Sequence, residues 1–308
     1  MASSASVLCA LLLLFLTAAA ASAAAPPTGL QLALMDKPAG VDTLGPHHFT
    51  WRHSRAAAPG SRLAPADVQA ACQLRVQAAP RAGEPARTIW DSGLRPRCDR
   101  PELVVPALPL ASDRSYAWSV RTQARGAAAP TEWAAAAGFS TGLLSQDEWH
   151  GRWIRGGTQM RRTFEVSGPV ERATIFVSAC QYYRLTLDGV RIGNSELDVG
   201  WTSFKTNRSY TTYDIEPALL APGKHTLGLR VGQGFCTPSS PLTDPHVGDE
   251  YDANAQRSAL LQLQMHAPGG GEPTIVASDG SWTVSDGPIL MDSTYCESAI
   301  PARLSQRA

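Results

Sequence analysis

The stretch that decides the fold is YRLTLDGVRI, residues 183–192. Apolar and polar side chains alternate from Tyr183 to Leu187, which is the two-residue period of a strand with one buried face. Asp188-Gly189 follows at once, and a tight hairpin turn needs residues that accept positive φ at both central positions. The alternation then resumes on the return strand. The stretch therefore predicts a β-hairpin.

The same period recurs along most of the chain. Between residues 26 and 142, short strand-like runs are separated by Pro and Gly, and Trp51, Trp118 and Trp133 are expected to pack between two sheets. Beyond residue 149 the alternation is denser, and only residues 216–220 look like a helical turn. The prediction is an all-β chain of two β-sandwich domains in series. The first, at residues 26–142, is fibronectin-III or Ig-like, and the second, at 143–305, is a jelly roll of the galactose-binding type.

Residues 1–25 have the composition of a secretory signal peptide. They hold an uncharged Leu-rich run, and Ala21-Ser22-Ala23 is a small-residue cleavage pattern. The rival interpretation is a signal anchor, but the apolar run is shorter than the ~20 residues of a spanning helix. We therefore expect a secreted, extracellular protein with no membrane attachment after cleavage.

Charge and cysteine content narrow the function further. Lys plus Arg and Asp plus Glu both number 27, and no basic run with interleaved aromatics is present, so nucleic-acid binding is not expected.

Without Cys9, five cysteines remain, and an odd number leaves at least one of them unpaired within the chain. Cys72 with Cys98 is one pairing open to the first domain. Two of Cys180, Cys236 and Cys296 could pair in the second.

Several long phrases resemble the N-terminal, non-catalytic part of bacterial-type α-L-rhamnosidases, glycoside hydrolase family 78. They are SYAWSVRTQARG (115–126), DEWHGRWI (147–154), QYYRLTLDGVRIGNSELDVGWTSFKTNRSYTTYDI (181–215), GKHTLGLRVGQGF (223–235) and SWTVSDGPILMDSTYCESAIPAR (281–303). In the last phrase Glu297 stands one residue earlier than in the family pattern, and Ile300-Pro301 replaces Tyr-Asp. The resemblance implies a fibronectin-III-like domain followed by the family's N-terminal sandwich. It also implies that the catalytic barrel of paired helices, which carries the family's acid and base, is absent from these residues.

Carboxylates beside aromatic residues raise the question of catalysis, because glycoside hydrolysis needs two facing carboxyl groups. Asp188 is explained by its place in the hairpin turn, and Glu196 and Asp198 fall in a loop. We therefore predict no catalytic residue in this chain. Asp244, Asp249 and Asp252 form an acidic loop that either holds calcium through carboxylate oxygens or is a charged surface loop.

Sugar binding without catalysis needs aromatic faces and nearby amide or carboxylate groups. Asn194, Trp201, Tyr213 and Asp214 are the candidates, with core packing as the alternative role for the aromatic residues. Asn207-Arg208-Ser209 is an acceptor sequence for N-glycosylation. The function expected is the N-terminal module of an α-L-rhamnosidase-like glycoside hydrolase, with a structural or L-rhamnose-binding role and no catalysis by itself. The alternative is a free-standing secreted lectin-like or adhesion protein. Rhamnose-containing glycans are the expected partners, and no cofactor is expected apart from the calcium alternative.

Overall fold

The structure is a computed structural model. It describes residues 25–43, 45–53, 69–80, 85–179, 182–196, 198–200, 202–203, 206–232, 257–287, 291–293 and 296–299. Within these ranges no helix is long and apolar enough to cross a membrane. Residues 1–24 of the expected signal peptide lie outside the described residues, so the signal peptide stays a prediction.

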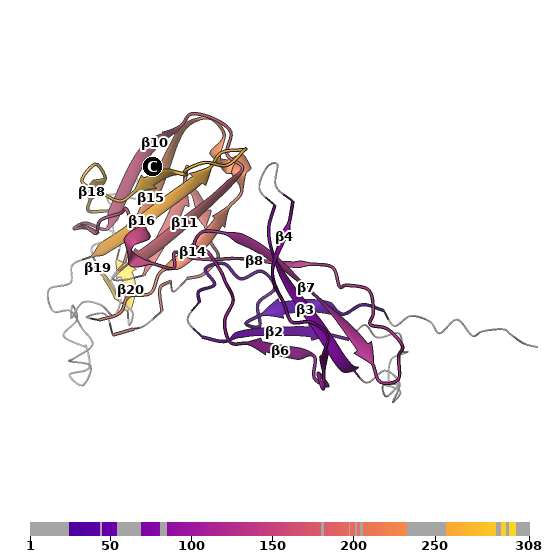
Figure 1. Ribbon diagram of the computed structural model, residues 1–308. Coiled ribbons are helices and arrows are strands. Elements are labelled where there is room, and N and C mark those ends of the chain that lie inside the picture. Colours follow the sequence, from indigo (N-terminus) through magenta and orange to yellow (C-terminus); the bar gives the residue numbers. More distant parts are fainter. Residues whose placement is uncertain are drawn as a thin grey trace, which may run out of the picture.

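The N-terminal domain is a sandwich of two antiparallel sheets (Figure 1). One sheet has the order β1-β2-β6, with β1 at Thr28–Leu32, β2 at His47–Arg52 and β6 at Glu102–Val105. The other has the order β4-β3-β7-β8, with β4 at Arg87–Asp91, β3 at Gln69–Ala78, β7 at Ser115–Ala124, β8 at Ala137–Ser140, and the short β5 at Arg95–Pro96 beside β3. Phe49 of the first sheet meets Trp118 of the second edge to face, with ring centroids 4.8 Å apart. The inward-facing alternation that the sequence predicts is therefore what joins the two sheets.

One tryptophan of this domain does not follow the prediction. Trp51 and Trp118 are buried in the core, but Trp133 is only partly buried and is outside the core cluster. The guanidinium groups of Arg75 and Arg121 lie over its ring, 4.1 Å and 4.8 Å from the centroid. Both arginines alternate with inward-facing core residues, so Trp133 covers the outer face of the sheet. The expectation that it packs between the sheets was wrong.

A disulfide joins Cys72 on β3 to Cys98, which follows β5. It is the pairing that the sequence left open for the first domain. The amide of Gln69 donates to the carbonyl oxygens of Cys98 and Arg100, so the loop before β6 is fastened to β3 by polar contacts as well.

The C-terminal domain is a second sandwich. One sheet has the order β13-β12-β15-β10-β18, with β13 at Val190–Ile192, β12 at Tyr183–Leu187, β15 at Gly223–Val231, β10 at Gln159–Val166 and β18 at Thr283–Ser285. The other has the order β14-β11-β16-β17, with β14 at Thr211–Ile215, β11 at Arg172–Ala179, β16 at Ser258–His266 and β17 at Thr274–Ala277, and with β9 at Ile154–Arg155 beside β16. A hairpin of β19, Met291–Ser293, and β20, Cys296–Ala299, follows. The only helical turns among the described residues are two 3-10 turns, η2 at Gln146–Glu148 and η3 at Pro217–Leu220.

The core of this domain consists of the apolar residues at alternate strand positions. Ile175, Leu227 and Leu263 are fully buried between the two sheets. The hairpin is formed as predicted: Asp188 and Gly189 both have positive φ, +52° and +81°, between β12 and β13. The predicted turn at 216–220 is η3. All-β architecture with two sandwiches in series is thus confirmed.

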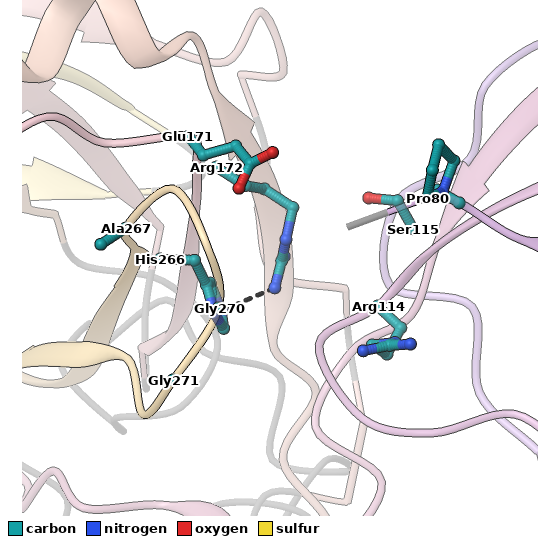
Figure 2. Close-up of a pocket in the computed structure, with 10 residues that line it drawn as sticks. Pro80, Arg114, Ser115, Glu171, Arg172, His266, Ala267, Gly270 and Gly271 are labelled. Carbon is teal, nitrogen blue, oxygen red and sulfur yellow. Dashed lines mark hydrogen bonds between the residues drawn. The ribbon is translucent and has the colours of Figure 1, made fainter. Parts of the chain in front are cut away.

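The two domains contact each other directly. The hydroxyl of Ser140, at the end of β8, donates to the carboxylate of Asp214 on β14. Arg172 of β11 donates to Asp113 of the N-terminal domain, and the same carboxylate lies 2.6 Å from Nε2 of His266 on β16. A pocket of about 260 Å3 lies beside these groups. Figure 2 shows Arg172 and His266 on one side of it and Arg114 and Pro80 on the other.

Candidate functional site

The largest of the three described pockets, about 560 Å3, lies where the segment between the domains meets the second sandwich. Its wall is formed by the connecting segment, by the residues before β14 and by the neighbouring strands β11 and β16. The lining side chains are Leu143, Leu144, Ser145, Gln146, Trp149, Trp153, Ser178, Thr206, Asn207, Arg208, Tyr210 and Leu260. The size is within the usual range for small-molecule sites, and three of these residues are aromatic.

The connecting segment is held in one conformation by a helix cap. Ser145 caps η2, its side chain accepting from the N–H of Asp147, and the carboxylate of Glu148 accepts from the N–H groups of Leu144 and Ser145. This reciprocal arrangement satisfies backbone donors that a helix start leaves unpaired. The carbonyl of Glu148 accepts from the amide of Gln262 on β16, which docks the segment onto the second sandwich. Trp149 follows Glu148 directly, so the cap of η2 and the contact with Gln262 together fix its position.

The inner wall of the pocket is aromatic. Trp149 contacts Tyr210 edge to face, with ring centroids 5.4 Å apart, and both rings pack near Phe176. The hydroxyl of Tyr210 donates to the carbonyl of Leu143 at 2.9 Å. Burial raises the pKa of Tyr210 above its ordinary value, so this phenol stays neutral and acts only through hydrogen bonding and its ring face.

The outer wall combines a second tryptophan with polar groups. The guanidinium of Arg208 lies over the ring of Trp153, 4.8 Å from its centroid. Asn207 is exposed at the rim, and its own carbonyl accepts from the hydroxyl of Thr202. The amide side chains of Gln146 and Asn207 and the hydroxyl of Ser178 add hydrogen-bonding groups to the same lining.

Such a surface suits a neutral sugar. A pyranose ring has an apolar face that packs on an aromatic side chain and a rim of hydroxyls that pair with amides and guanidinium groups. Trp149, Trp153 and Tyr210 offer the first kind of contact, and Gln146 and Arg208 offer the second.

The sugar-binding residues proposed from the sequence are not gathered in this pocket. Tyr213 and Asp214 are neighbours on β14 and face opposite ways. Tyr213 packs against the core, where its hydroxyl donates to Asp198 and lies 3.1 Å from that of Tyr183. Asp214 accepts from Ser140 at the domain contact, and burial raises its pKa. Both side chains already have structural partners.

The remaining predicted residues are placed as follows. Asn194 is exposed in the loop after β13. Trp201 and the calcium candidates Asp244, Asp249 and Asp252 lie outside the described residues, so their roles stay predictions. Among the described residues, no group of three or more His, Cys, Asp or Glu side chains is placed to hold a metal ion.

The carboxylates of the hairpin and of the loop after it have basic partners. Desolvation by itself would raise the pKa of Asp188, but the hydrogen bonds that it accepts from His225 and from the N–H of Thr226 outweigh it and lower the pKa. Arg191 lies 2.6 Å from Glu196, and this hydrogen bond lowers the pKa of Glu196. A general acid for glycoside hydrolysis needs a pKa shifted upward, so neither group is tuned for proton donation at neutral pH.

Sequence reasoning missed Trp149 and Trp153 as site residues. The two tryptophans stand four residues apart in the polar segment DEWHGRWI, outside any strand with clear alternation. A pair of large aromatic residues in a polar connector is the signal that could have found them, since no sheet face accounts for their burial. Tyr210 completes the pocket from 57 residues further along, which local patterns do not reveal.

The fold and the pocket define a two-domain β-sandwich protein with an aromatic cleft at the domain junction. Comparison with known families then identifies both domains. The family model "Rha78A-like, N-terminal immunoglobulin domain" matches residues 27–145, and "Alpha-L-rhamnosidase N-terminal domain" matches residues 168–307. Both domains are therefore similar to the N-terminal domains of α-L-rhamnosidases.

Similar proteins agree with this assignment. An alpha-L-rhamnosidase of Formosa agariphila is 22% identical over 74% of this chain, and one of Streptomyces avermitilis is 27% identical over 56%. The chain covers 26% and 19% of these relatives, about a quarter or less of their length. Two solved structures share the fold over 92% and 90% of the chain, at 22% and 23% identity: an alpha-L-rhamnosidase from Dictyoglumus thermophilum, TM-score 0.74, and one from Aspergillus terreus, TM-score 0.70. The chain covers 32% and 31% of those two.

Proposed function

We propose that this N-terminal rhamnosidase module binds rhamnose-containing carbohydrate in the pocket of Trp149, Trp153 and Tyr210 and does not cleave it unaided. The observation that carries the proposal is the pairing of these aromatic rings with Gln146 and Arg208 in one pocket of about 560 Å3. Support for the sugar class comes from the relatives, which are named alpha-L-rhamnosidase. Export is part of the same proposal and rests on the composition of residues 1–25.

The lack of cleavage is inferred from Asp188 and Glu196, which are described carboxylates in the hairpin turn and in the loop after β13. Asp188 of the hairpin and Glu196 of the loop after it have lowered pKa values; Asp188 pairs with His225 and Glu196 with Arg191. Neither provides the pair of opposed carboxyl groups, one of them protonated, that glycoside hydrolysis requires. Turnover of an aryl α-L-rhamnoside by the purified chain would overturn this part of the proposal.

Isothermal titration with L-rhamnose and a rhamnosyl disaccharide tests the binding. The decisive variant is Trp153→Ala, because this ring is only partly buried and its loss should spare the core. The matched control is Trp133→Ala in the first domain, a partly buried tryptophan that also lies beneath arginine side chains. Loss of a stacking aromatic residue should weaken binding by about tenfold or more, equal to about 1.4 kcal/mol. The control should bind like the parent chain.

A structural role is the second candidate function. The segment that carries Trp149 is fastened to both domains, through Ser112 to the first and Gln262 to the second. A folded chain that takes up no sugar, with calcium or with a chelator, would favour this role. The same pair of titrations tests the calcium prediction for the acidic loop.

A further inference from the structure

The outward face of the sheet β13-β12-β15-β10-β18 carries a groove of about 320 Å3 lined by arginine side chains. Arg184 of β12 is directly opposite Arg230 of β15, and Arg230 is opposite Gln159 of β10. Ser285 of β18 continues this row at its end. The row thus crosses four strands, or roughly 14 Å at the usual strand spacing of about 4.8 Å.

A second row lies beside the first on the same face, since residues two positions apart on a strand point the same way. It runs from Thr186 through Gly228 to Arg161. Gly228 has no side chain at the centre, and an added Cβ would come within 2.6 Å of the hydroxyl of Thr186. The centre of the groove is therefore formed by the backbone at Gly228, with the arginine side chains around it.

The positive charge of this face is poorly balanced. Arg184 shares the carboxylate of Glu196 with Arg191, at 3.5 Å and 2.6 Å. Within the described part of the chain, no carboxylate forms an ion pair with Arg161 or Arg230. Like charges directly opposite on neighbouring strands are unfavourable, as in the Arg184–Arg230 pair. An anion placed between them would relieve the repulsion.

We propose that this groove binds the carboxylate of a uronic acid residue in an acidic oligosaccharide. A guanidinium group matches a carboxylate with two parallel hydrogen bonds, and Arg161 and Arg230 are available for it. Thr186, Gln159 and Ser285 provide hydroxyl and amide groups for the hydroxyls of the same sugar ring. Single-stranded nucleic acid fits less well, because none of the described residues lining the groove is aromatic and base stacking needs such rings.

This site is separate from the aromatic pocket. The two share no lining residue, and their ligand chemistries differ: a neutral sugar on rings in one, an anionic sugar on guanidinium groups in the other. Failure of neutral sugar binding therefore leaves this proposal standing, and the reverse holds too.

The test is titration of the purified chain with a galacturonate oligomer and with its methyl ester, which has the same rings without the charge. The test variant is Arg161→Gln/Arg230→Gln. The control, Arg125→Gln/Lys224→Gln, removes two positive charges from exposed positions elsewhere. Lys224 is six residues from Arg230 on the same strand, roughly 20 Å away.

The expected result is binding of the acid, with the ester at least about tenfold weaker, because charge-assisted hydrogen bonds are the strong ones. The test variant should lose at least about tenfold in affinity and the control no more than about twofold. Thermal melting should show that the test variant is folded, since the loss of Arg230 removes its repulsion with Arg184. The proposal is overturned if the acid does not bind, if the control weakens as much as the test variant, or if a sulfated glycan or a DNA oligonucleotide binds equally well.

Discussion

Asp113 and Arg172 belong to different domains, and Oδ1 of the aspartate lies 2.5 Å from Nη1 of the arginine. The aspartate side chain is 6% exposed, and its second oxygen faces His266 at 2.6 Å. Burial by itself would raise the pKa of Asp113, but the hydrogen bonds from His266 and Arg172 outweigh it and lower the pKa. This carboxylate is therefore the charged centre of the domain contact.

Asp113→Asn should destabilise the chain by about 3 kcal/mol, because it leaves the charge of Arg172 without its partner. The replacement keeps the shape of the side chain, and Asn also tolerates the φ of +47° at this position. Urea unfolding at neutral pH measures the loss. Glu102→Gln is the control, since it removes a carboxylate from an exposed pair with Arg100 at 3.7 Å. Equal stability of the two variants would show that the domain contact does not depend on this ion pair.

His225 and Asp188 give a stability contribution with a defined pH window. The carbonyl of Ala221 and the carboxylate of Asp188 accept from the two ring nitrogens and raise the pKa of His225. A raised pKa means that this contribution is fully present below the unfolded value of about 6.5 and is lost as pH rises through the folded one. The pKa of Asp188 is lowered, so its share is present above about 4 and is lost as pH falls through the folded pKa.

His225→Gln should therefore cost most between about pH 5 and 6.5, on the order of 1–2 kcal/mol. The difference from the parent chain should shrink above neutral pH, where the parent histidine loses its proton. Urea unfolding at a series of pH values checks this. His48→Gln, at an exposed position of β2, is the matched control for replacing a histidine by glutamine. A cost for His225→Gln that is the same at pH 5.5 and pH 8.5 would contradict the charged pairing.

These residues show how much of the structure could be predicted from the sequence. The hairpin at 183–192 was predictable because turn chemistry and alternation are local, and Asp188 was correctly identified as a turn residue. Its contact with His225 joins positions 37 residues apart, which the alternation pattern does not show. Trp133 was misplaced for a similar reason, because it precedes β8 and no strand period fixes which way it faces.

The candidate site was harder to predict than the fold. Strand periodicity indicates which face of a strand is buried, and the core residues obey it. The aromatic pocket is instead built from a connector and a loop, 143–153 and 206–210, whose meeting depends on tertiary packing. Composition near the hairpin predicts Tyr213 and Asp214 as ligand residues, but the strand turns their side chains to opposite faces.

Gly142 is required by the close approach of Tyr210. An added Cβ at position 142 would overlap the phenol, whose hydroxyl is already held by the carbonyl of Leu143. Gly142→Ala should therefore push the ring out of place and cost about 1–3 kcal/mol through overpacking. Gly168→Ala is the matched control, because an added Cβ there meets nothing within 4 Å. Differential scanning calorimetry should show lower stability for Gly142→Ala than for Gly168→Ala, and sugar titration should show weaker binding. Equal results for the two variants would show that the position of Tyr210 does not matter to the pocket.

Asn207 gives the last prediction, because it lines the aromatic pocket and is also the acceptor of a glycosylation sequence. A glycan on its exposed amide would be bulky and would stand at the pocket rim. Chain produced with the glycan attached should therefore bind the rhamnosyl ligand at least about tenfold more weakly than chain produced without it, or about 1.4 kcal/mol.

Mass spectrometry establishes the occupancy of Asn207, and titration before and after enzymatic removal of the glycan measures the effect. Asn207→Gln from the same glycosylating host is the second comparison, since it keeps an amide while removing the acceptor. Full binding by the glycosylated chain would place the sugar away from the rim of Asn207, on the Trp149 side of the pocket. Weak binding that deglycosylation restores would show that the modified asparagine and the bound sugar compete for the same space.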